Sequence, residues 1–356
     1  MPIQKMPYIK FATENYVNPK YNLAKSDVAP PNLEKYINNK NYFSMLQEAP
    51  YTLMKEFMEL ISKAYNISKD KVELTIGVTN SFFTISQVMK HLGQRRVLVE
   101  SPGYEPFWLT NMSNGLEVVL INRDPNDFTF NLVDIEKNTK EGDWLWLANP
   151  HNPSGKFLTT NEISDLAEIM KKKNGYLFVD EIYHDFFSPF GQDSAINLGD
   201  NIIVSSSLTK VYGLGSLKLG WLLGPREIIE IVTNLRLHQF MLIPGPSTAT
   251  ALAIFDDLEG IRVHQIERLE VNREFIKSSL KRYESFYPDR GTVSLLRLPK
   301  GMDDIELAKT LNKSCGLVLS PGSFFNVPGH LRLCYADSLD MVKQGAELLR
   351  MHLENS

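Results

Sequence analysis

The sequence has few of the features that mark secreted, membrane-spanning or metal-binding proteins. Its 356 residues include only two cysteines, Cys315 and Cys334, which excludes a disulfide framework and suits a reducing cytoplasm. It has no run of about 18 apolar residues and no charged-then-apolar leader, so we expect neither a membrane span nor secretion. Its seven histidines do not occur at metal-ligand spacing, so we expect no metal site.

The chain also lacks an excess of positive charge. Its 38 Lys and Arg residues are outnumbered by 42 Asp and Glu residues, and the net charge of -4 argues against a nucleic-acid partner. There is no internal repeat and no low-complexity segment. Hydrophobic residues make up 43% and charged residues 22% of the chain, which is the composition of an ordinary soluble globular protein.

The order of apolar and polar segments predicts an α/β fold with a second, smaller unit. A chain of 356 residues exceeds the usual single core, so we expect two domains. Apolar runs alternate with helical stretches, which is typical of a mostly parallel central sheet covered by helices. The expected strands are 72–76, 96–100, 117–122, 144–148, 176–180, 201–205 and 220–224. The expected units are an N-terminal arm at 1–45, a large α/β domain at 46–250 and a smaller C-terminal domain at 251–356.

The segment 205–220 (SSSLTKVYGLGSLKLG) is the most informative in the sequence. Lys210 lies just past an apolar strand, after three serines and before a glycine-rich turn. Burial there, together with the second cation Lys218, would depress the pKa of Lys210, and such a lysine can form a Schiff base with a carbonyl. The hydroxyls and Lys218 also suit a phosphate. A Schiff-base lysine beside a phosphate site suggests pyridoxal phosphate (PLP).

Two further strands end in polar side chains. The strand at 144–148 runs into the turn Asn-Pro-His-Asn-Pro-Ser-Gly, which contains Asn152. The strand at 176–180 ends at Asp180, and Tyr183 follows three residues later. Because ligands of open α/β sheets bind at the carboxyl ends of the strands, we expect these three side chains and Lys210 to converge on one crevice.

The order Asn-Pro-x-Asn-Pro-Ser-Gly, then Asp-x-x-Tyr, then Ser-x-x-Lys with a cation eight residues later, resembles that of the class I/II aminotransferases, which are PLP enzymes of fold type I. The resemblance extends from about Tyr21 to the last helix. It implies that the N-terminal arm and the C-terminal unit together form a small α+β domain. It also implies a homodimer whose two subunits share each active site, with an amino acid and a 2-oxo acid as substrates.

The resemblance gives the converging residues their roles. Lys210 would carry the Schiff base and move a proton between the substrate's α-carbon and the cofactor, which proximity makes effectively intramolecular. Asp180 would pair with the pyridinium nitrogen and keep it protonated. Tyr183 and Asn152 would hydrogen-bond the phenolic oxygen of the ring, and Tyr104 would stack on the ring.

The phosphate would be held by a helix-opening turn at 79–82 and by the segment around Lys210. The chain departs from the family's common pattern twice here. It has Ser81-Phe82 where glycine and a small or polar residue are common, and Lys218 where arginine is usual. Because lysine cannot make a bidentate fork, we expect looser cofactor binding. The residues expected to bind the phosphate are Ser81, Phe82, Ser207, Thr209 and Lys218.

The substrate residues also follow from the resemblance. Arg332, which comes after Pro-Gly-x-x-Phe at 321–325, matches the arginine that binds the α-carboxylate, and Asn152 and Ala24 are expected beside it. Either Tyr42 or Phe43 would reach the partner subunit's phosphate, and the spacing does not settle which. Phe82 stands where some family members that accept acidic substrates carry a cation, which favours apolar or aromatic amino acids.

The sequence therefore predicts a PLP-dependent aminotransferase that acts through a Lys210 Schiff base. A PLP-dependent lyase or decarboxylase on the same fold is an alternative, because it would keep Lys210, Asp180 and Asn152. A non-catalytic PLP-binding protein is a further alternative, although no basic helix-turn-helix precedes residue 20. A nicotinamide dehydrogenase is disfavoured, because Gly213-x-Gly215 lacks the third glycine of the dinucleotide fingerprint.

Overall fold

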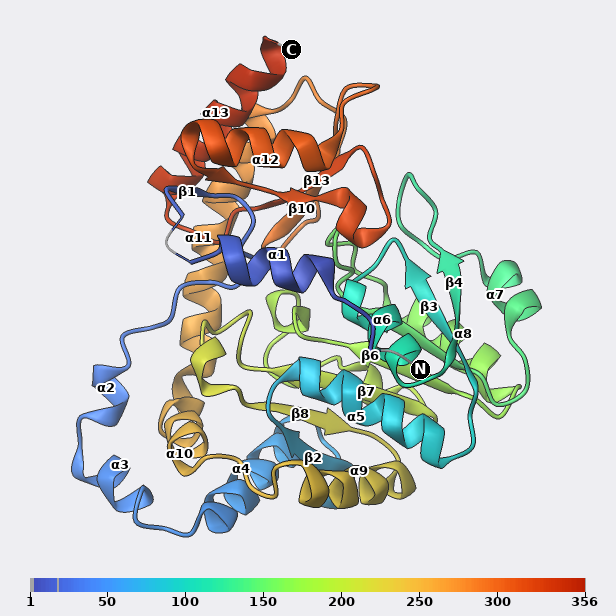
Figure 1. Ribbon diagram of the computed structural model, residues 1–356. Helices are drawn as coiled ribbons and strands as arrows, with labels where there is room; N and C mark the ends of the chain where they lie inside the picture. The colour runs from blue at the N-terminus through green and yellow to red at the C-terminus, as the bar shows by residue number, and fades with distance from the viewer. Residues whose placement is uncertain (1–2, 18, 356) are drawn as a thin grey trace.

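The computed structural model describes residues 3–17 and 19–355 and has a seven-stranded sheet at its centre (Figure 1). The strand order is β2-β8-β7-β6-β5-β3-β4; the pairs from β7 to β4 are parallel, and β8 is antiparallel to both of its neighbours. Each of the seven predicted strands is present, and the last apolar run before Lys210 extends two residues further than predicted. The strands are β2 (Val72–Thr75), β3 (Arg96–Ser101), β4 (Glu117–Asn122), β5 (Trp144–Ala148), β6 (Tyr176–Asp180), β7 (Ile202–Ser207) and β8 (Gly220–Leu223).

Both faces of this sheet are buried. Along β5, Leu145 and Leu147 point into one hydrophobic cluster while Trp144 and Trp146 point into another, as the alternation of a strand requires. Side chains of α5, α6 and α9 cover the tryptophan face, and side chains of α4, α7, α8 and α10 cover the leucine face. These helices are α4 (Pro50–Ala64), α5 (Val78–His91), α6 (Glu105–Ser113), α7 (Leu132–Asn138), α8 (Thr160–Lys171), α9 (Arg226–Gln239) and α10 (Gly245–Ile254).

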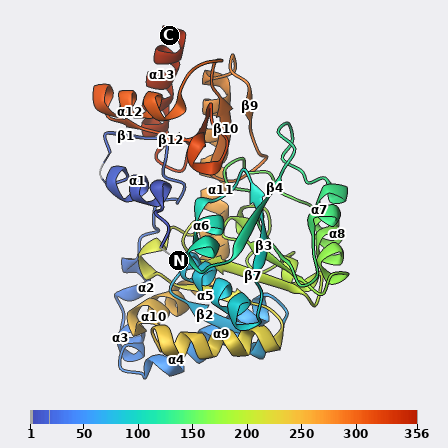
Figure 2. The same cartoon turned by 45° about the vertical axis from the view of Figure 1, so that its right-hand side comes forward.

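A second, antiparallel layer lies above the first (Figure 2). Its four strands run in the order β12-β13-β10-β9, and a further strand from the N-terminal region, β1 (Tyr21–Asn22), pairs in parallel with β11 (Leu317–Val318). The division of the chain at residues 45 and 250 stays a prediction. The elements of this layer are β9 (Ser285–Phe286), β10 (Val293–Arg297), β12 (Ser320–Pro321), β13 (His330–Cys334), α11 (Leu258–Ser279), α12 (Asp304–Cys315) and α13 (Leu339–Glu354).

The N-terminal region contains more regular structure than its weak periodicity indicates. It forms α1 (Pro7–Asn15), α2 (Glu34–Ile37) and α3 (Lys40–Met45). Helix α1 lies between the two layers (Figures 1 and 2). Its first amides are capped by a residue far along the sequence, because the backbone N–H groups of Tyr8 and Ile9 donate to the carboxylate of Glu105 at 3.0 and 3.3 Å. No helix of the described residues is long and apolar enough to cross a membrane.

Candidate active site

A pocket of about 210 Å³ lies between the carboxyl ends of the central strands and the four-stranded layer. Nine of the twelve predicted site residues line it. The predicted residues outside the lining are Ala24, Ser81 and Ser207. The nine are Phe82, Tyr104, Asn152, Asp180, Tyr183, Thr209, Lys210, Lys218 and Arg332. The structure therefore brings most of the predicted residues to one place, including residues from both layers.

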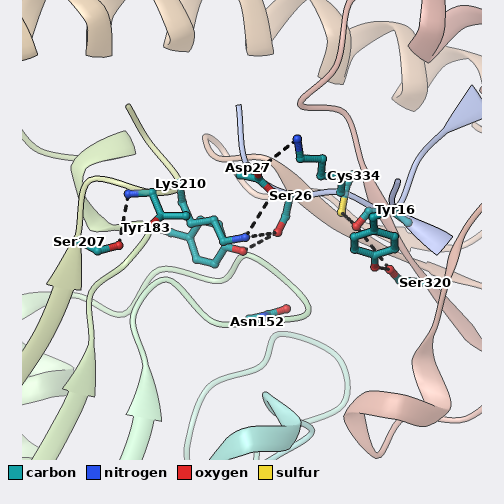
Figure 3. Close-up of polar contacts among 12 residues, drawn as sticks. Tyr16, Ser26, Asp27, Asn152, Tyr183, Ser207, Lys210, Ser320 and Cys334 are labelled. Carbon is teal, nitrogen blue, oxygen red and sulfur yellow. Dashed lines mark hydrogen bonds and ion pairs between the residues drawn. The ribbon is translucent and has the colours of Figure 1, made fainter. Parts of the chain in front are cut away.

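Lys210 projects from the loop that follows β7 toward the N-terminal segment (Figure 3). Its Nζ lies 3.3 Å from Ser26 Oγ and 3.6 Å from Asp27 Oδ1. Burial lowers the pKa of Lys210 and is the largest single influence, but Tyr183 and Asp27 raise it, and the net pKa is above that of an ordinary lysine. The predicted depression of this pKa is wrong for the ligand-free protein, because the sequence did not show that Asp27 faces the amine.

Asp180 is a buried acid at the end of β6 with no cation beside it. Its side chain accepts hydrogen bonds from Ser205 Oγ at 3.1 Å and from the Ile182 amide at 3.3 Å. It takes part in no ion pair within residues 3–17 and 19–355, and burial raises its pKa to about 7. A cation placed against this carboxylate would lower the pKa again, so the site favours a protonated ring nitrogen.

Three further side chains frame the space between Lys210 and Asp180. The Tyr183 hydroxyl lies 2.7 Å from Ser26 Oγ. Asn152 accepts a hydrogen bond from Arg332 Nη1 at 3.0 Å, which leaves its amide nitrogen to donate into the pocket. Tyr104 precedes α6, and its ring meets that of Phe82 edge to face at 6.1 Å. Tyr104 lines the pocket, and its expected stacking on a flat ligand stays a prediction.

The helix next to the pocket begins one residue before the predicted turn at 79–82. Helix α5 begins at Val78, directly after Gly77, whose φ of +87° suits glycine. The amides of Asn80 and Ser81 donate to the Gly77 carbonyl, whereas the first amides of a helix have no partner within it, and Gly77, Val78 and Thr79 line the pocket. A glycine directly before an apolar helical pattern is the signal that could have located this start.

Three residues that were expected to bind the phosphate are buried: Ser81, Phe82 and Ser207. The Ser81 hydroxyl is fully buried and lies 3.0 Å from Thr75 Oγ1. Phe82 is also buried, and its ring lines the pocket wall. Ser207 likewise stays below the surface, where its Oγ accepts a hydrogen bond from the Thr209 amide at 3.2 Å. Ser81 and Ser207 are not among the residues that line the pocket, and their expected part in binding the phosphate stays a prediction.

Lys218 is the second lysine in the lining of this pocket. It is exposed and follows the short 3₁₀ turn Gly215–Leu217, in a left-handed backbone conformation with φ of +49°. Thr209 lines the pocket beside it. The start of α5, Thr209 and Lys218 thus line one pocket, and their expected part in binding a phosphate stays a prediction.

Arg332 reaches the pocket from β13 and is only 1% exposed. Its Nη2 donates to the hydroxyl of Tyr8 at 2.8 Å, to the carbonyl of Ala24 at 2.9 Å and to Ser320 Oγ at 3.3 Å. All its acceptors are neutral, and it forms no ion pair with any residue in the described part of the chain. Burying a charge without a counter-ion costs several kcal/mol, so this guanidinium is suited to receive an anion.

Ala24 contacts Arg332 through its backbone carbonyl, and its expected place beside the substrate stays a prediction. Tyr8, Ser26 and Asp27 were missed, because they belong to a segment whose pattern indicated only an irregular arm. Tyr8 packs its ring against Phe325 with centroids 4.9 Å apart. No local signal in the sequence could have found these residues, since their partners lie far along the chain.

Comparisons with known proteins agree with this site. The model of the family "Aminotransferase class I and II" matches residues 17–349. The chain is 25% identical over 290 residues to an aspartate aminotransferase of Streptomyces avermitilis, covering 70% of each protein. It is 25% identical over 339 residues to a probable N-acetyl-LL-diaminopimelate aminotransferase of Bacillus subtilis, covering 90% of this chain and 82% of the relative. A crystal structure of a PLP-dependent aminotransferase from Streptococcus suis superposes with a TM-score of 0.83 at 20% identity, covering 100% and 99% of the two chains.

The fold is that of the PLP enzymes of fold type I. The chain belongs to the class I and II aminotransferases, and it is a PLP-dependent enzyme that exchanges an amino group between an amino acid and a 2-oxo acid.

Proposed function

We propose that Lys210 binds PLP covalently and that Arg332 binds the α-carboxylate of the substrate. The observation that carries this proposal is the buried guanidinium of Arg332, which has only neutral partners and shares a pocket with Lys210. A carboxylate would supply the missing counter-ion and could replace the Tyr8 hydroxyl on Nη2. Because every amino-acid donor and every 2-oxo acid acceptor has this carboxylate, one residue would serve both directions of the exchange.

The other residues of the pocket fit the remaining parts of the cofactor. Asp180 would hold the ring nitrogen, Tyr104 would cover the ring, and Asn152 and Tyr183 would hydrogen-bond its phenolic oxygen. The amides of Val78 and Thr79, with Lys218, would hold the phosphate. When bound, PLP withdraws electrons from the substrate's α-carbon, and this chemistry belongs to the cofactor.

The protein's own contribution is to orient the substrate and to move one proton. Arg332 and Asn152 fix the carboxylate, so that one face of the α-carbon meets Lys210. The free amine of Lys210 would then take the proton from the substrate's α-carbon and deliver it to a carbon of the cofactor. Because amine and carbon are held together, no second molecule has to diffuse in.

We also propose that the amino-acid donors have apolar or aromatic side chains. The cations that line the pocket are Lys210, Lys218 and Arg332, and each has a role above. The remaining wall includes Phe82 and Ile182. An acidic side chain would therefore find no further cation among the described residues that line the pocket.

An absorbance spectrum of the PLP-loaded protein, taken with a panel of amino acids, tests these assignments. We expect the cofactor band to bleach with apolar or aromatic L-amino acids and to return with a 2-oxo acid. Release of ammonia or carbon dioxide would instead indicate a lyase or a decarboxylase. Bleaching only by aspartate or glutamate would contradict the proposed substrate class.

A homodimer in the cytoplasm is the arrangement that we propose for the working enzyme. Exposed apolar side chains support it: Phe43 is 57% exposed and Met241 is 56% exposed. Tyr42, by contrast, is buried, and its hydroxyl lies 3.2 Å from Thr250 Oγ1. We therefore propose that Phe43, and not Tyr42, contacts the partner. Light scattering of the wild type and of Phe43→Ser tests this, with a smaller fraction of dimer expected for the variant.

A further inference from the structure

Asp27 is a carboxylate next to the amine of Lys210, and nothing in the proposed mechanism uses it. Its Oδ1 lies 3.6 Å from Lys210 Nζ, and its Oδ2 lies 3.3 Å from the ammonium of Lys25 (Figure 3). The neighbouring Ser26 hydroxyl lies 3.3 Å from the same Nζ and 2.7 Å from the Tyr183 hydroxyl. The amine thus faces a short polar segment of the N-terminal region.

The backbone holds this segment firmly against the loop that carries Lys210. The Val28 amide donates to the carbonyl of Lys210 at 3.4 Å. Gly213 has a φ of +70°, and a Cβ there would lie 2.4 Å from the Ala29 carbonyl oxygen, so only glycine allows the two segments to pack this closely. The position of Asp27 is therefore set by backbone contacts on both sides and not by a mobile surface side chain.

The charges that face Lys210 come from several elements. Burial lowers its pKa most, and Arg332 on β13 lowers it further, while Tyr183, Asp27 and Tyr8 raise it. Burial raises the pKa of Tyr183, so this phenol is neutral at neutral pH. Burial likewise raises the pKa of the nearby Cys334 thiol.

Asp27 is different from these neighbours, because it is charged at neutral pH. Burial works against its ionisation, but Lys210 and Lys25 hold its pKa below the ordinary value. It therefore places a full negative charge 3.6 Å from Lys210 Nζ at neutral pH. Its side chain is only 28% exposed, so solvent screens the pair incompletely.

This charge bears directly on how Lys210 meets PLP. The amine attacks an aldehyde only after its ammonium form has lost a proton to solvent. The new C–N bond then forms as the aldehyde oxygen leaves as water, so one proton and one water are released for each lysine bound. A group that favours the ammonium form therefore slows the capture at low pH and leaves it unchanged at high pH.

We propose that Asp27 is a positioning residue that holds Lys210 as an ammonium ion against the N-terminal segment, and so sets the pH at which the cofactor-free protein captures PLP. This rests on the proposed role of Lys210. It predicts that removing the carboxylate shifts the pH profile of capture to lower pH, and that removing the competing cation Lys25 shifts it to higher pH. A purely structural role for Asp27 would produce neither shift.

The test measures the rate at which cofactor-free protein captures PLP between about pH 7 and about pH 12, a range that includes the ordinary lysine pKa of about 10.4 and values above it. Absorbance follows the reaction, and borohydride reduction with peptide mapping locates the label on Lys210. For Asp27→Asn we expect the midpoint about one unit lower than in the wild type, and a rate about tenfold higher at pH values below both midpoints. Asp27→Glu should return toward the wild-type profile. Asp200→Asn is the matched control, because it removes an aspartate that pairs with Lys171 at 2.8 Å far from the pocket.

The outcomes separate this inference from the proposed function. An unchanged midpoint in a folded Asp27→Asn protein that is labelled on Lys210 would overturn the role of Asp27. Absence of any Lys210 label in the wild type would instead overturn the assignment of Lys210. Should Asp27→Asn fail to fold, Lys25→Met decides the question, since an unchanged or lower midpoint in that variant contradicts the proposal.

Discussion

Replacing Arg332 by leucine tests the central assignment most directly. The substitution removes the guanidinium whose Nη1 and Nη2 bond Asn152, Tyr8, Ala24 and Ser320, and it leaves an apolar side chain in a site that is 1% exposed in the wild type. A carboxylate bound in the fork would lose two charge-assisted hydrogen bonds. At about 1.5–3 kcal/mol each, the loss is about 3–6 kcal/mol, or roughly two to four orders of magnitude in kcat/KM.

The assay follows each half-reaction separately by the absorbance of the cofactor. Amino-acid donors and 2-oxo acid acceptors should lose kcat/KM alike, because both have the carboxylate. Amines without a carboxylate should be affected far less, and labelling of Lys210 by PLP should be retained. Arg297→Leu is the control: this arginine lies on the neighbouring strand β10, is 60% exposed and pairs with Glu284. If Arg332→Leu lost activity only with donors that have acidic side chains, Arg332 would bind the side chain and not the α-carboxylate. The proposed orientation of the substrate in the pocket would then be wrong.

Three other changes have defined outcomes. Lys210→Ala should abolish turnover and the borohydride-fixable label, and a label on another lysine of the wild type would contradict the assignment. Lys218→Ala should release PLP more readily while keeping much of the rate at saturating PLP. Lys218→Arg should bind PLP as tightly as the wild type or more tightly. If an equilibrium titration gave the wild type and Lys218→Ala equal affinities for PLP, Lys218 would not belong to the phosphate site. The folded-state pKa of Asp180, about 7, lies above the ordinary value of 3.8, so the unfolded chain releases this proton first. This group should contribute up to about 4 kcal/mol to the free energy of unfolding of the ligand-free protein. The contribution should be fully present below about pH 4 and should be lost as the pH rises to about 7. Denaturant titrations of Asp180→Asn at several pH values should lack this component, and identical pH dependence in both proteins would show that Asp180 is not the group responsible.

The parts of this fold that follow from local pattern could be predicted from the sequence. Runs such as 144–148 and 176–180 are apolar throughout because both faces of the sheet are covered, and their polar ends necessarily meet at one edge. This reasoning placed Asp180, Asn152 and Lys210 together in one pocket. The capping box of α8 is likewise a local pattern, since Thr159 and Glu162 satisfy each other within four residues.

The rest depends on contacts between distant segments. Helix α1 is capped by Glu105, which lies 97 residues from Tyr8, so no pattern near residue 8 indicates it. The electrostatic environment of Lys210 was misjudged for the same reason, because Asp27 is brought to it from 183 positions earlier in the chain. The start of α5 at Val78, one residue before the predicted turn at 79–82, depends on where β2 ends.

The pairing of β1 with β11 has a consequence for the order in which a newly made chain can assemble. The seven strands of the central sheet lie between residues 72 and 223, so the residues proposed to hold PLP can come together while later residues are still being added. The hydrogen bond between the Ala24 carbonyl and Arg332 cannot form until Arg332, 308 positions further on, has been added. The pairing of β1 likewise cannot form until residue 317 has been added. During synthesis the cofactor half of the pocket would therefore exist before the carboxylate half. A chain that stopped short of β13 would retain groups able to trap an aldehyde but none to select an amino acid.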